Sequence, residues 1–190
     1  TFGNWLRLLS RRPTIERAYW KRFVAVTAVS VLNSLFAAVE RFSFGRRLSR
    51  TTIDRAPVFI LGHWRSGTTL MQELLSLDEQ FITPTLYQCS FPDHFLVTQG
   101  WLAPLTAWLQ PRTRPMDAVL NSWNAPAEEE IAMLLTTLKS PYLISLFPDA
   151  RERVQEFDTL FGRHSTDEST AWKAAYLKFL KKLLIHGHRT

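Results

Sequence analysis

Two glycines five residues apart, Gly62 and Gly67, enclose side chains that can bind a phosphate-like anion. Glycine lets a backbone turn tightly, so that successive N–H groups point at one anion. An arginine can add a forked pair of hydrogen bonds, and hydroxyl groups can add single ones. A plain connecting turn needs only the glycines. We therefore predict an anion-binding loop that also uses Arg65, Ser66, Thr68 and Thr69.

The residues on either side of this loop predict a strand followed by a helix. Residues 58–61 are apolar, are bounded by Pro57 and Gly62, and are too few for a helix, which is typical of a buried parallel strand. Apolar residues within 70–77 recur at helical spacing and predict a helix that packs on a sheet. The start of such a helix favours anions. The expected fold class is therefore α/β, a P-loop-like parallel sheet with flanking helices, incomplete within this chain.

The loop differs from the nucleoside triphosphate loop G-x-x-x-x-G-K-[ST] at one important position. Thr68 stands where that motif has lysine, and the basic residue is Arg65, inside the loop. Because a β/γ-phosphate site with magnesium needs the lysine, the loop suits a different 5′-terminal anion. A P-loop kinase or NTPase remains one alternative. A membrane-attached interaction module with a degenerate loop is another.

The stretch from Phe59 to Leu70 resembles the 5′-phosphosulfate-binding loop of the sulfotransferase family, which uses 3′-phosphoadenosine 5′-phosphosulfate (PAPS). The Arg-Ser-Gly-Thr-Thr form is closer to the bacterial and tyrosylprotein branches than to the cytosolic branch. The resemblance implies sulfuryl transfer to a hydroxyl or amine of a small-molecule, lipid or glycan acceptor, with neither metal nor nucleic acid. It makes Arg65 catalytic as well as donor-binding. Weaker likeness over roughly residues 50–190 lies in segments 84–89, 114–117 and 126–130.

The general base is less evident from the sequence. In the tyrosylprotein branch a glutamate just after the loop helix serves as base, but Thr85 stands near that position here. Our first candidate is Glu128, which falls at the edge of the apolar stripe of a predicted helix opening near Pro126. A charge that merely complements the helix dipole is the alternative interpretation. His94 and Asp117 are the other candidates.

The positive charge of the chain is concentrated at its N-terminal end. Residues 1–55 hold 11 of the 23 Lys and Arg but 3 of the 17 Asp and Glu, a net charge of +8, whereas the remainder carries −2. Residues 23–39 are free of charge and lie at the lower length limit for a membrane span. A packing helix, an interfacial helix and a span all remain open. We expect a basic helical segment over 1–50 that can associate with membranes, followed by the sulfotransferase-like domain over 51–190.

Composition places the chain in a reducing compartment. The single cysteine, Cys89, excludes internal disulfides and is expected to be a small buried filler. The expected location is therefore cytoplasmic, with peripheral binding to the inner face of the membrane as an option. The family binds the 3′-phosphate of its donor with residues from a later strand and helix. We therefore expect this chain to hold the first half of a sulfotransferase and to be inactive alone.

Overall fold

The computed structural model describes residues 1–10, 15–63, 66–111, 113, 121–140, 142 and 166–187, and these are predominantly helical. Short 3-10 turns cover Arg17–Tyr19 and Ala107–Leu109. The helices are α1 (Phe2–Leu9), α2 (Trp20–Arg50), α3 (Thr68–Leu75), α4 (Leu86–Ser90), α5 (Phe95–Thr106), α6 (Glu129–Thr137) and α9 (Thr166–Gly187).

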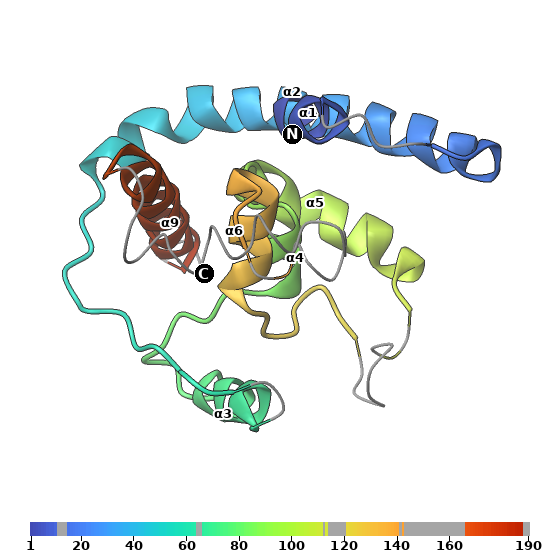
Figure 1. Cartoon of the computed structure of the whole chain (residues 1–190). Coiled ribbons are helices and arrows are strands. Elements are labelled where there is room, and N and C mark those ends of the chain that lie inside the picture. The colour runs from blue at the N-terminus through green and yellow to red at the C-terminus, as the bar shows by residue number, and fades with distance from the viewer. Residues whose placement is uncertain are drawn as a thin grey trace.

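The long helix α2 lies across a group formed by α4, α5, α6 and α9 (Figure 1). It contacts α1, α5 and α9, while α6 contacts both α4 and α9. In Figure 1, α3 lies apart from this group, on the side opposite α2, between two extended stretches of chain. The helix that follows the predicted anion loop is therefore outside the main helical core.

The core forms where α4, α5, α6 and α9 meet. Phe179 and Leu183, one helical turn apart on α9, are buried there, as their spacing predicts. Cys89 on α4 is fully buried, which confirms its expected role as a filler, and burial raises the pKa of its thiol. The α9 face thus supplies the apolar contacts that hold α4 and α6 together.

The predicted parallel sheet is wrong. In the part of the chain that the structure describes there is no strand, although Thr85 and Pro126 form an isolated antiparallel bridge. Val58 is 63% exposed and Leu61 is 89% exposed, so the apolar run before the loop is not buried. A strand is stabilised by hydrogen bonds to neighbouring strands, and no described segment pairs with 58–61. The run therefore stays irregular, although its composition favours a strand.

A buried ion pair holds α2 to the core. Lys182 of α9 binds Glu40 of α2, and both side chains are almost fully buried. Glu40 Oε2 also accepts from the backbone N–H of Leu96 at 2.8 Å, and Lys182 Nζ donates to the carbonyl of Pro92. Burial raises the pKa of the Glu40 carboxyl and lowers that of the Lys182 ammonium, while their mutual attraction opposes both shifts. The domain boundary at residue 50 stays a prediction, but α2 is joined to α5 and α9 by this pair.

Candidate functional site

The loop enters α3 through a backbone conformation that favours glycine. Gly67 is the N-cap of α3, with φ 90° and ψ 13°, in the left-handed region. A side chain at this position would add strain, because a Cβ meets the following carbonyl there. The N–H of Met71 donates to the carbonyl of Gly67 at 3.0 Å and closes the first turn. The backbone geometry at residue 67 therefore requires the glycine that the sequence has there.

The other glycine is needed for close approach. A Cβ on Gly62 would lie 2.6 Å from Ser66 Oγ and 2.6 Å from Thr68 Cγ2, too near for either atom. Ser66 donates to the carbonyl of His63 from its backbone N–H at 3.1 Å and from its hydroxyl at 2.6 Å. The chain therefore folds back so that residue 62 touches the start of α3. Arg65 lies outside the described residues, and its two predicted roles stay predictions.

The start of α3 is suited to an anion. Its N-cap makes no side-chain hydrogen bond to the first turn, and that turn carries no acidic residue. Ser66 is exposed, and Thr68 and Thr69 are partly exposed, so their hydroxyls are accessible. The partial positive charge of a helix start adds to these donors. One accessible turn thus brings together Gly62, Ser66, Gly67, Thr68 and Thr69. Their role in binding stays a prediction.

One hydrogen bond connects the helix after the loop to the residue just before the candidate base, Glu128. Gln72 Nε2, on α3, donates to the carbonyl of Ala127 at 2.9 Å, and Ala127 directly precedes Glu128. The segment that carries Ala127 is itself fixed, because its N–H donates to the carbonyl of Pro84 at 3.0 Å beside the bridge between Thr85 and Pro126. This bond therefore joins α3 to the segment just before α6, although α3 itself lies apart from the helical core. Sequence reasoning did not single out Gln72.

Three carboxylates gather at the start of α6, which begins just after the N-cap Glu128. The hydroxyl of Tyr142 donates to Glu128 Oε2, and the hydroxyl of Tyr176 donates to Glu129 Oε1 at 3.4 Å. Burial raises the pKa of the Glu130 carboxyl, and its Oε1 is buried with no hydrogen-bond partner among the described residues. The helix dipole favours all three negative charges.

An aromatic stack connects the segment before the loop to the same carboxylates. The ring of Phe59 stacks on that of Tyr176, with centroids 6.3 Å apart. The ring of Trp172 also stacks on Tyr176, with centroids 5.3 Å apart. Burial raises the pKa of the Tyr176 hydroxyl, and the nearby charge of Glu129 raises it further. Only the fold shows that Tyr176, on α9, touches a carboxylate from α6.

A family model described as the sulfotransferase family matches residues 57–189. The chain belongs to the sulfotransferase family. It is 36% identical over 190 residues to omega-hydroxy-beta-dihydromenaquinone-9 sulfotransferase Stf3 of Mycobacterium bovis and, equally, to that of Mycobacterium tuberculosis. The alignment covers 100% of this chain and 48% of each relative, so the chain spans about half the length of the curated relatives it matches. No solved structure matches the chain.

The matched region of the chain agrees closely with the family resemblance predicted from the loop. The match begins at the residue before the apolar run and includes the loop, α3 and the carboxylates of α6. The predicted family is therefore confirmed.

His94, another candidate base, lies in a buried environment between α5 and α2. Its ring is 1% exposed, with Nδ1 2.9 Å from Thr98 Oγ1 and Nε2 3.2 Å from Asn33 Oδ1. Burial, reinforced by the positive charge of Lys182, lowers the pKa of His94 to about 4, which keeps the ring neutral at pH 7. These contacts join α5 to α2 and favour a structural role. A catalytic His94 stays a prediction, and Asp117 lies outside the described residues.

Proposed function

We propose that the whole protein transfers a sulfuryl group from PAPS to a hydroxyl group of a small-molecule or lipid acceptor. The observation that carries this proposal is the 2.9 Å hydrogen bond from Gln72 to Ala127, because it joins the loop helix to the residue directly before Glu128. Both relatives are named for a hydroxylated dihydromenaquinone. Their name favours a hydroxyl group on an apolar acceptor for this protein too.

The proposed reaction needs a held donor, a stabilised leaving group and a base. The acceptor oxygen attacks sulfur, a new S–O bond forms, and the bond from sulfur to the bridging phosphate oxygen breaks. The bridging oxygen takes the electron pair and leaves as part of 3′-phosphoadenosine 5′-phosphate. N–H groups and hydroxyls at the start of α3 bind the phosphosulfate, and Arg65 stabilises the charge that develops on the departing phosphate. The acceptor proton passes to a carboxylate.

Glu128 is the carboxylate that we assign as the base. It follows Ala127, the residue held by the loop helix. Thr85, near the position where the tyrosylprotein branch has its glutamate, pairs with Pro126, two residues before Glu128. The Tyr142 hydroxyl holds one oxygen of Glu128, which orients the carboxylate toward a substrate at the other oxygen. Position and orientation therefore support Glu128.

Ligand titration of the whole protein tests the donor class. We expect binding of 3′-phosphoadenosine 5′-phosphate and no comparable binding of ATP with magnesium, because Thr68 replaces the lysine that a triphosphate site needs. Gly67→Ala should weaken the binding roughly tenfold through strain at φ 90°. Gly100→Ala is the matched control, because Gly100 lies within α5 with open space around it. Tighter binding of ATP with magnesium would instead indicate a kinase or NTPase.

Arg65→Ala should lower kcat for sulfuryl transfer by on the order of 10² or more, since a donor aimed at developing charge acts mainly in the transition state. Arg65→Lys should be milder, because lysine keeps the charge and loses the fork. Thr68→Ala should mainly raise the dissociation constant of the donor. Steady-state rates and donor titrations of the three variants check these expectations. If Arg65→Ala kept the wild-type turnover, the loop would have no part in sulfuryl transfer.

A further inference from the structure

One side of α2 exposes large apolar side chains along most of its length. At 100° per residue the five members of this apolar face of α2 lie within about 60° of one another around the helix. Their exposed fractions run from 41% at Val31 to 94% at Phe42. The apolar face of α2 consists of Trp20, Val24, Val31, Leu35 and Phe42.

Polar residues on the side opposite this face join α2 to the rest of the protein, although Val26 and Val29 on that side are 46% and 49% exposed. Glu40 is buried in its ion pair with Lys182, and Asn33 contacts His94. Next to the apolar face, and not opposite it, the hydroxyl of Thr27 accepts from the indole N–H of Trp5 of α1 at 2.9 Å. A helix of a soluble protein normally turns its apolar side inward. The apolar face of α2 instead points away from α5 and α9, and in the part of the chain that the structure describes its members are 41% to 94% exposed.

The helical stretch Arg17–Arg50 is long and apolar enough to cross a membrane by length and composition. Its most apolar window has a mean hydropathy of 1.8, and 11% of that window is buried. A buried core helix passes the same test, but this helix is mostly exposed. The apolar residues are therefore placed where another apolar phase could cover them.

Positive charge flanks the apolar face of α2 at both ends. Arg17 and Lys21 precede or open the helix, Arg46 and Arg50 close it, and all four are exposed. At 100° per residue Lys21, Arg46 and Arg50 fall about 20–60° beyond the edge of the apolar face that Leu35 marks. The acidic residue of α2, Glu40, is buried on the opposite side. An apolar stripe between basic ends is complementary to anionic lipid headgroups over acyl chains.

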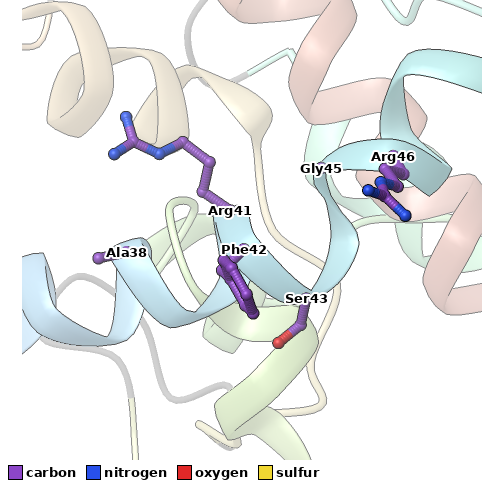
Figure 2. A pocket seen from close by; sticks show the side chains of 6 residues that line it. All are labelled: Ala38, Arg41, Phe42, Ser43, Gly45 and Arg46. Atoms are coloured by element: carbon purple, nitrogen blue, oxygen red, sulfur yellow. The ribbon is translucent and has the colours of Figure 1, made fainter.

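A shallow hollow at the C-terminal half of α2 also combines basic and apolar side chains. Figure 2 shows the side chains of Arg41 and Phe42 leaving the helix in different directions, with Arg46 one turn further on. Guanidinium groups bind phosphate oxygens, and an exposed phenyl ring favours the boundary between headgroups and acyl chains. The hollow is lined by Ala38, Arg41, Phe42, Ser43, Gly45 and Arg46.

We propose that α2 docks the protein flat on an anionic lipid membrane, with the apolar face inserted and the basic residues at the headgroups. The helix does not span, because its other side is joined to α5 and α9 by Glu40 and Asn33. A spanning position would carry this buried ion pair and its neighbours into hydrocarbon. The proposal is independent of sulfuryl transfer, since it uses neither the loop nor the carboxylates.

Vesicle co-sedimentation of the whole protein tests the docking. We expect binding to vesicles that contain phosphatidylglycerol, and weak binding to pure phosphatidylcholine. Phe42→Glu should weaken the binding on the order of tenfold, whereas Leu77→Glu, a matched control at a 79% exposed residue just after α3, should not. Arg46→Glu with Arg50→Glu should also weaken it roughly tenfold or more. Lys173→Glu on the exposed surface of α9 is the charge control.

Site-specific labels distinguish the orientations. Cys89 is buried, so Val24→Cys, Leu35→Cys and Phe42→Cys each supply one accessible thiol for a nitroxide. Flat docking places the three labels at similar shallow depths, whereas a spanning helix would place Leu35 deep and the other two near opposite surfaces. A spanning pattern would overturn the proposal. So would vesicle binding unaffected by Phe42→Glu, or a Phe42→Glu variant that loses only self-association, which would assign the face to a second copy.

Discussion

Glu128→Gln should lower kcat for sulfuryl transfer by about 10² to 10⁴, the range typical of general base catalysis. Glutamine keeps the shape of the side chain and its hydrogen bond with Tyr142, but it cannot take up the acceptor proton. The dissociation constant of the donor should change little, because the loop and α3 are untouched. Steady-state rates with a hydroxylated apolar acceptor, together with donor titration, measure the two quantities separately.

The neighbouring carboxylates provide matched controls. Glu129→Gln should retain most of the rate, because we assign the base to Glu128, the residue directly after the Ala127 that Gln72 holds. Glu130→Gln replaces a partly buried carboxyl whose pKa is raised by burial, and we expect a smaller loss of rate than at residue 128. If Glu130→Gln lost the larger part of the rate while Glu128→Gln kept it, the base would be Glu130 and our assignment would be wrong.

Lys182→Met should lower the free energy of unfolding by about 3–5 kcal/mol, the usual effect of removing one partner from a buried ion pair. Lys182 is 1% exposed and Glu40 is 5% exposed, so the carboxylate that remains cannot reach water. Its described hydrogen bond would then be the one from the N–H of Leu96. Chemical denaturation followed by circular dichroism measures the difference.

Two further variants control this result. Lys178→Met changes an exposed lysine of the same helix and should shift the free energy of unfolding by less than about 0.5 kcal/mol. Combining Lys182→Met with Glu40→Gln should recover part of the loss, because the buried charge is gone and an amide oxygen still accepts from Leu96. If Lys182→Met unfolded at the same denaturant concentration as the wild-type protein, α2 would contribute little to the folded core.

The sequence predicted the local backbone geometry of the loop better than its surroundings. Gly62 and Gly67 were identified correctly, because a tight turn and a left-handed φ are requirements of a few adjacent residues. Thr85 and Gln88 form a capping box, which the spacing of a threonine and a glutamine would also have indicated. Signals that depend on neighbouring residues are therefore readable without a structure.

Features that join distant parts of the chain could not be predicted in this way. The strand expected over 58–61 depends on partners elsewhere, and composition alone cannot supply them. The pairing of Glu40 with Lys182 and the hydrogen bond from Gln72 to Ala127 have no local signature. The orientation of α2 was equally hidden, because its apolar residues suit both a packed and an exposed helix. These features follow from tertiary packing.

The hydrogen bond from Gln72 of α3 to Ala127, just before α6, also places an uneven constraint on substitution during evolution. Its acceptor is a main-chain oxygen, so residue 127 can change without breaking it as long as the new side chain fits its buried position. Its donor is the side chain of Gln72, which no shorter side chain can replace. Drift at one end of this contact is tolerated, whereas selection should act on the other. A glutamine outside both the loop and the carboxylates would thus be retained for the distance that it spans.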